Sequence, residues 1–200
     1  APAYRTIAVD KDMSHEVEAL RSTGTLKEYG LENWLEENTE RPHKFTLAMP
    51  FITFIFGFNK NWDVCGGYAF FKTQQISGFS DVLFKAPFLN ISDNQMICFG
   101  DKMYNGPKRG LYADTQHAIG CFWSTEFNPD YIYNYHAYQD VPAVCDYLTW
   151  QYYSEQDPMF VYKVDWIKTD YNLGEYIHRA RQWTTVDSEE RRSRFRDYYG

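Results

Sequence analysis

The stretch from Phe45 to Phe84 limits the fold more than any other part of this sequence. It is rich in Phe, Ile, Val and Thr, residue types that favour β-strands, and polar turn-forming residues interrupt it at Asn59–Asp63 and at Ser77–Gly78. Strand composition broken by such turns is typical of hairpins. We therefore predict an antiparallel β-meander of at least three strands, with Pro50 at a bulge or an edge because it lacks the backbone N–H that a central strand donates.

Segments with helical spacing of apolar residues lie on both sides of the meander. Residues 1–40 combine a short strand with helices, in which Leu31, Trp34 and Leu35 fall on one helical face. The predicted fold class is α+β, an antiparallel meander flanked by N-terminal and C-terminal helices in a single domain over residues 1–177. Residues 178–200 are interpreted as an Arg-rich helical tail. The other predicted elements are helices over Asp114–Phe127, Pro142–Tyr153 and Ser188–Tyr199, and a strand over Phe160–Trp166.

Composition narrows the classes of function. The chain of 200 residues has a net charge of −7, which disfavours the body of the protein as a nucleic-acid binder and leaves the Arg-rich tail as the one candidate for that role. No run approaches the roughly 18 apolar residues of a membrane span. Aromatic residues make up 19% of the chain, which predicts many half-buried rings and an amphipathic surface suited to protein partners.

The four cysteines, Cys65, Cys98, Cys121 and Cys145, include no C-x-x-C pair. We therefore expect reduced thiols in a cytoplasmic protein, without a zinc site or a resident cofactor. His117 and Cys121 are four residues apart, a spacing that can place two metal ligands on one helix. Because no second close pair accompanies them, packing is the favoured interpretation. The sequence also lacks phosphate-binding, dinucleotide-binding, serine-hydrolase and zincin motifs.

The segment from Ala86 to Cys98 carries the strongest candidate chemistry. Its polar turn at Ser92–Gln95 is expected to fold the chain back, so that Asn90 faces Cys98. A side-chain amide beside a thiol suits acyl transfer through a thioester, in which the thiolate attacks and the amide donates a hydrogen bond to the developing oxyanion. From the residues alone a second interpretation stays open, in which Cys98 is a small buried apolar residue beside a tight turn.

This segment resembles the active-site loop of ubiquitin-conjugating enzymes. In that family a His-Pro-Asn-Ile string is followed by a turn and by Gly-x-Ile-Cys, with eight positions from the Asn to the catalytic Cys. The present chain has Asn90–Ile91 and Ile97–Cys98 at the same separation. It is still more similar to the prokaryotic branch of the superfamily, of the PRTRC system protein B type, in the strings at 86–100 and Phe122–Phe127. The resemblance covers residues 45–127, which would form a conjugating-enzyme-like core.

The resemblance implies a function and a set of partners. Cys98 would take a ubiquitin-like modifier as a thioester and pass it to an amine, and Asn90 would stabilise the oxyanion. Asp101 is the nearest carboxylate that would orient the incoming amine. The implied partners are the ubiquitin-like modifier and an adenylating activating enzyme. The chain departs from the family pattern where Phe88–Leu89 replaces His-Pro and where Gln95 replaces Gly.

The alternative hypothesis is a non-catalytic interaction or structural module, such as a phage or plasmid assembly component. It rests on the tyrosine-rich stretch that follows the loop, because exposed tyrosines are typical of protein-binding surfaces. The residues predicted to line that surface are Tyr131, Tyr133, Tyr135 and Tyr138.

Overall fold

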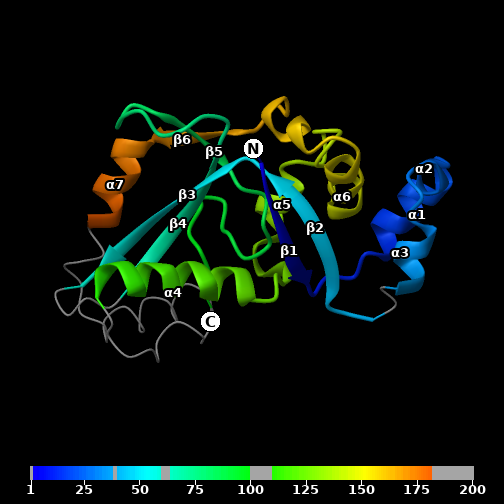
Figure 1. Cartoon of the computed structure of the whole chain (residues 1–200), viewed down its shortest axis with the longest axis horizontal. Coiled ribbons are helices and arrows are strands. Elements are labelled where there is room, and N and C mark those ends of the chain that lie inside the picture. The colour runs from blue at the N-terminus through cyan, green and yellow to red at the C-terminus, as the bar shows by residue number, and fades with distance from the viewer. Residues whose placement is uncertain (1, 38–39, 60–63, 100–109, 182–200) are drawn as a thin grey trace.

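Two antiparallel sheets form the centre of the molecule (Figure 1). The computed structural model describes residues 2–37, 40–59, 64–99 and 110–181. Strands β1 (Ala3–Val9) and β2 (His43–Met49) pair with each other. The second sheet has the order β3 (Phe51–Phe58), β4 (Val64–Lys72), β5 (Val82–Lys85) and β6 (Lys168–Asn172). The predicted antiparallel meander is confirmed, since β3, β4 and β5 are consecutive along the chain and adjacent in this sheet.

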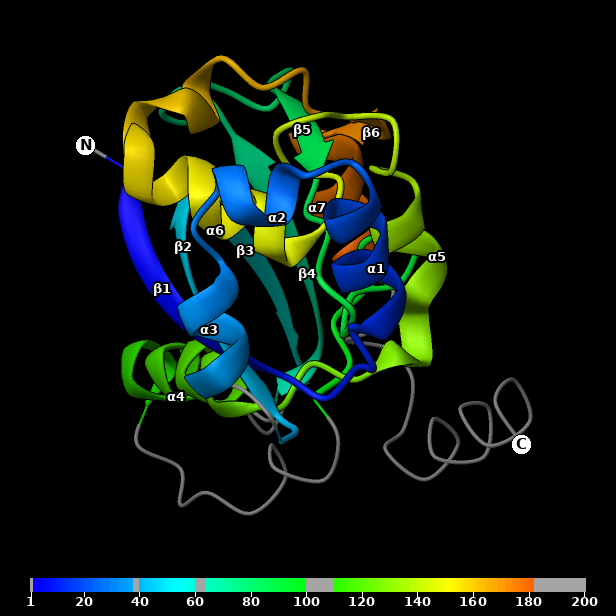
Figure 2. The same cartoon turned by 90° about the vertical axis from the view of Figure 1, so that its right-hand side faces the viewer.

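Helices surround the two sheets and complete an α+β fold, as predicted. The helices that follow β1 lie together at one end of the molecule, and the last described helix lies at the opposite end (Figures 1 and 2). The first group is α1 (Ser14–Ser22), α2 (Thr25–Glu28) and α3 (Glu32–Glu37), and the last helix is α7 (Leu173–Arg181). Between them the chain forms α4 (Leu111–Ser124), α5 (Ile132–His136) and α6 (Tyr147–Gln156), with 3₁₀ turns η2 (Pro129–Tyr131) and η3 (Pro158–Tyr162).

Strand β4 is buried on both faces because its alternating side chains enter two different cores. Successive residues of a strand point to opposite sides of the sheet. Ala69 and Phe71 therefore enter the main core, whereas Tyr68 and Phe70 pack against α7, with ring centroids 5.0 and 4.4 Å from that of Tyr176. The cover provided by α7 explains why β4 is apolar without the polar alternation of a half-exposed strand.

Helix α6 takes the place of a neighbouring strand along the free edge of β2. The Thr46 N–H donates to Gln151 Oε1 at 3.0 Å, and the Ala48 N–H donates to Ser154 Oγ at 2.9 Å. The Ala48 carbonyl accepts a hydrogen bond from Trp150 Nε1 at 2.9 Å. These side chains satisfy the backbone groups that β2 would otherwise offer to a third strand. The two sheets therefore stay separate, although a single residue lies between β2 and β3 along the chain.

The strand predicted over Phe160–Trp166 is wrong. The Asp157 carboxylate accepts the Met159 N–H at 3.0 Å, and Pro158 occupies the first position after this N-cap. Both features favour a helical start, so the chain forms the 3₁₀ turn η3 here. Strand β6 begins only at Lys168.

The predicted boundary after residue 177 falls inside α7. Ala180 of this helix is buried in the same cluster as the β4 aromatic side chains, so the folded body continues to Arg181 at least. The helix predicted over Ser188–Tyr199 lies outside the described residues. Within the ranges that the structure describes, no helix has the length and apolar character needed to cross a membrane.

A mostly buried ion pair secures the turn between β4 and β5. Lys72 Nζ lies 2.7 Å from Asp81 Oδ2, and the side chains of both residues are less than a tenth exposed. The Ser77 N–H and hydroxyl donate to the same carboxylate at 2.8 and 2.6 Å. The Lys72 ammonium first, and the two Ser77 groups after it, hold the pKa of Asp81 well below its ordinary value.

Asp81→Asn is expected to lower the melting temperature by several degrees at neutral pH and to lose this effect in acid. A carboxylate whose pKa is lowered by folding stabilises the fold above its unfolded pKa, about 3.9, and this contribution disappears as the pH falls toward the folded pKa. Thermal melts of both proteins from about pH 7 down to about pH 2.5 measure the difference. Asp170→Asn, at an exposed carboxylate, is the matched control. A difference in melting temperature that does not change with pH would contradict this role of Asp81.

Candidate active site

Within the segment Ala86–Phe99, residues 90–98 form a tight hairpin that places Asn90 opposite Cys98. The Cys98 N–H donates to the Asn90 carbonyl at 2.9 Å, and the Ser92 N–H donates to the Met96 carbonyl at 2.9 Å. Residues opposed in this way in an antiparallel pair carry their side chains on the same face, with Cβ atoms about 5 Å apart. The polar turn noted in the sequence thus brings Asn90 and Cys98 together.

Asn90 is buried, and its side chain makes no hydrogen bond to the rest of the described chain. Its exposed fraction is 2%, and neither Oδ1 nor Nδ2 has a partner within residues 2–37, 40–59, 64–99 and 110–181. A buried polar group left unpaired costs about 1–3 kcal/mol, and such a group calls for an explanation, of which a catalytic role is one. The Cys98 thiol is half-buried and free of any disulfide. The pair therefore combines a nucleophile with a ready hydrogen-bond donor.

The second arm of the hairpin is bonded to the edge of β4. The Ile97 N–H donates to the Gly67 carbonyl at 2.8 Å, and the Ala69 N–H donates to the Gln95 carbonyl at 3.2 Å. Strand β5 pairs with only two residues of this edge, so the hairpin occupies the part that β5 leaves free. The side chains of Phe56 and Ile97 lie close to the Gly67 backbone. A Cβ added at Gly67 would lie 2.9 Å from the Phe56 ring and 3.2 Å from Ile97 Cδ1.

The first arm of the hairpin is anchored in the aromatic core. Phe88 is fully buried, and its ring centroid lies 6.1 Å from that of Trp150 and 5.9 Å from that of Trp123. The Tyr147 hydroxyl donates to the Pro87 carbonyl at 3.1 Å. Trp123 belongs to the later string on which the family resemblance rests, so both parts of that resemblance meet around Phe88.

Two buried amides that had no predicted role join the hairpin to α5. Gln95 and Asn134 are both fully buried and are bonded to each other. The one indication in the sequence was the replacement of the family's Gly by Gln95. Asn134 lies among tyrosines in the sequence, and nothing in its neighbourhood distinguished it.

The predicted tyrosine surface is wrong for two of its four residues. Tyr135 and Tyr138 are buried, and the Tyr138 hydroxyl donates to the Lys85 carbonyl at 2.7 Å. They lie three residues apart on the inward side of α5 and of the turn that follows it, so both rings enter the core. Tyr133 is 76% exposed and Tyr131 is half-buried. These four residues therefore do not form a continuous surface.

The remaining positions predicted from the sequence are Asp101, the other cysteines and the His117–Cys121 pair. Asp101 lies outside the described residues. The four cysteines all lie within them, and none forms a disulfide there. His117 Nε2 lies 3.5 Å from Cys121 Sγ on α4. In the described part of the chain, no group of three or more His, Cys, Asp or Glu side chains is placed to hold a metal ion.

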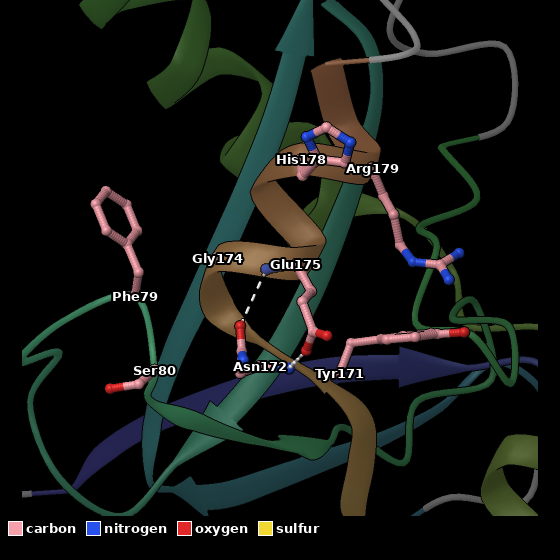
Figure 3. Close-up of a pocket in the computed structure, with 8 residues that line it drawn as sticks. All are labelled: Phe79, Ser80, Tyr171, Asn172, Gly174, Glu175, His178 and Arg179. Carbon is pink, nitrogen blue, oxygen red and sulfur yellow. Dashed lines mark hydrogen bonds between the residues drawn. The ribbon is translucent and has the colours of Figure 1, made fainter.

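A separate hollow of about 610 Å³ lies beside α7 (Figure 3). The Arg179 guanidinium carbon lies 3.7 Å from the centre of the Tyr171 ring. Asn172 Oδ1 accepts the Glu175 N–H at 3.0 Å, and Glu175 Oε2 accepts the Asn172 N–H at 2.8 Å, which is a capping box at the start of this helix. Phe79, 72% exposed, borders the hollow. No site residue predicted from the sequence lines it.

The fold and the hairpin define the class of protein. A meander flanked by helices, with an Asn held opposite a Cys eight residues later, is the arrangement that the resemblance to conjugating enzymes implies. The model of the family described as prokaryotic E2 family D matches residues 32–155, more than half of the chain. The chain therefore belongs to this family of conjugating-enzyme-like proteins, which confirms the predicted prokaryotic branch. No curated protein and no solved structure gives a significant match to the chain.

Proposed function

We propose that Cys98 receives the C-terminal acyl group of a ubiquitin-like modifier as a thioester and passes it to an amine. The observation that carries this proposal is the buried Asn90 amide, which has no partner among the described residues and stands opposite the Cys98 thiol. A hydrogen-bond donor held beside a nucleophile is the arrangement that acyl transfer requires.

In the loading step, Cys98 Sγ attacks the carbonyl carbon of an activated acyl donor as a thiolate. A new carbon–sulfur bond forms while the bond from that carbon to the leaving group breaks, and the leaving group takes the electron pair and then a proton. An ordinary cysteine is only partly ionised at neutral pH, so the donor has to arrive already activated. An adenylating activating enzyme that presents the modifier as a thioester is the proposed partner.

In the transfer step, a substrate amine attacks the thioester carbonyl, and the carbonyl oxygen gains negative charge. Asn90 Nδ2 donates a hydrogen bond to this oxyanion. The carbon–sulfur bond then breaks, Cys98 leaves as a thiolate, and the amine nitrogen gives its proton to a base or to solvent. Asp101, three residues after Cys98, is the carboxylate proposed to orient the amine.

A synthetic peptide that ends in a glycyl thioester is expected to acylate Cys98 faster than the other three cysteines. Intact-mass measurement follows the adduct, excess thiol removes it, and peptide mapping locates it. Cys98→Ala is expected to lose the fast adduct. Cys65→Ala, at another half-buried cysteine, is the matched control that keeps it.

Equal acylation of Cys65, Cys98 and Cys145 would contradict the proposal, because it would show that the surroundings of Cys98 give it no advantage. The natural donor is tested separately. An adenylating enzyme and a small modifier with a glycine end, encoded beside this chain, are expected to load Cys98 only when ATP is present.

A further inference from the structure

The two arms of the active-site hairpin are held at their separation by a buried hydrogen-bonded network. Ala86 begins the turns that lead into the first arm, four residues before Asn90, and Gln95 starts the second arm, three residues before Cys98. The Ala86 N–H donates to Gln95 Oε1 at 2.8 Å. This bond spans the two arms directly, so it limits how far the Asn90 arm can move relative to the Cys98 arm.

Helix α5 closes the network from outside the hairpin. Asn134 Nδ2 donates to the Ala86 carbonyl at 2.7 Å, and Asn134 Oδ1 accepts a hydrogen bond from Gln95 Nε2 at 3.0 Å. Ala86, Gln95 and Asn134 thus form a ring of three hydrogen bonds in which each amide both donates and accepts. Because the donors and acceptors alternate, neither amide can turn over without losing two bonds.

The network is shielded from water, so its members have no water molecule as an alternative hydrogen-bond partner. The side chains of Gln95 and Asn134 are both fully buried. Removing Gln95 takes away the partners of the Ala86 N–H and of Asn134 Oδ1, and removing Asn134 takes away the partner of the Ala86 carbonyl. Losing such a bond in the interior is costlier than losing an exposed one. The network therefore favours a single arrangement of the hairpin.

The backbone of Gln95 has a conformation that favours glycine, so the presence of a side chain here calls for an explanation. Its φ of +67° is the left-handed conformation that glycine adopts freely and other residues avoid, and Gln95 is the one non-glycine residue with positive φ in the described chain. A glycine would satisfy the turn without strain. The side-chain amide is what glycine would not supply.

We propose that Gln95 and Asn134 are positioning residues, which align the Asn90 amide with the Cys98 thiol through their common bonds to Ala86. This inference rests on the proposed thioester function and adds to it the residues that set the geometry of the oxyanion donor. Gln95 and Asn134 touch neither the thiol nor the acyl group in this scheme, and they act only through the hairpin.

Gln95→Gly and Asn134→Ala test the proposal by two measurements. The first is hydrogen exchange of the Cys98 backbone amide, which is bonded to the Asn90 carbonyl. It is expected to exchange about 10-fold faster or more in both variants, relative to the amides of β3, which report global opening. The second is aminolysis of the loaded protein by free lysine, expected to slow about 10-fold or more, because a small misalignment is costly in rate. Gln139→Ala, at an exposed amide just after α5, is the control expected to change neither.

The double variants with Asn90→Ala decide whether the network acts through Asn90. If it does, Gln95→Gly slows aminolysis in the wild-type background and has no further effect once Asn90 is alanine. The proposal is overturned if the slowing persists in the Asn90→Ala background, or if Cys98 exchange is unchanged in both network variants. If wild-type protein fails to load at all, the proposed function fails, and the exchange measurement alone then decides whether the network holds the hairpin.

Discussion

Aminolysis of a preformed Cys98 thioester is expected to slow by about 10²- to 10³-fold when Asn90 is replaced by alanine. The Asn90 amide has no competing hydrogen bond in the described chain, so the donor is in place before the oxyanion forms. Both proteins are loaded with the same glycyl thioester peptide, free lysine is added, and mass spectrometry follows the loss of acyl-protein in a single turnover. Loading is expected to change much less, because a thiolate is a better nucleophile than an amine.

The stability of the same variant separates a catalytic role from a structural one. A buried amide without a partner destabilises the fold, so Asn90→Ala is expected to keep or raise the free energy of unfolding. Asn134→Ala removes a buried amide that is hydrogen-bonded on both sides, and it is expected to lower that free energy. A less stable Asn90→Ala protein with unchanged aminolysis would show that Asn90 is a packing residue.

Phe88→Ala is expected to lower the free energy of unfolding by about 3–5 kcal/mol, the usual range for a buried aromatic residue. The Phe88 ring is fully buried, with the ring centroids of Phe71, Phe122 and Phe127 at 5.5, 5.9 and 5.3 Å. Removing it would leave a cavity at the centre of the main core, which the surrounding rings fill only in part. Urea denaturation of both proteins, monitored by tryptophan fluorescence, measures the difference.

Phe79→Ala is the matched control for this substitution, because Phe79 is 72% exposed. Its effect is expected to stay within about 0.5 kcal/mol. A loss at Phe88 no larger than the loss at Phe79 would contradict the core assignment. The burial of Phe88 also explains a departure from the family pattern. Where that pattern has His, this chain places an apolar ring, so the hairpin is anchored by packing rather than by a polar side chain.

The opposition of Asn90 and Cys98 could be predicted because its determinants are local. A polar turn between two short apolar pairs favours a hairpin, and the eight-residue separation then places the two side chains on one face. The meander was predictable for the same reason, since strand composition and turn residues alternate within a few dozen positions. Neither prediction depends on which residues lie on the opposite side of the core.

The positions of the tyrosines could not be predicted in the same way. Tyrosine has an apolar ring and a polar hydroxyl, so it suits a wet surface and a core with one acceptor equally well. The acceptor for the Tyr138 hydroxyl is the Lys85 carbonyl, 53 residues earlier in the chain. Composition around Tyr135 and Tyr138 holds no information about that distant partner, and the predicted surface failed there.

The sequence by itself determined the α+β class, the antiparallel meander and the pairing of Asn90 with Cys98. Only the tertiary structure decided the long-range contacts: Gln151 bonds to the edge of β2 from 105 residues away, and Asn134 reaches Gln95 across 39 residues. Residue types and spacing set what an element is and which of its faces is apolar. Many apolar faces of similar size can cover one another, so the choice among them depends on how all the side chains pack together. The packing of α5 beside the hairpin is what brings Asn134 to Gln95.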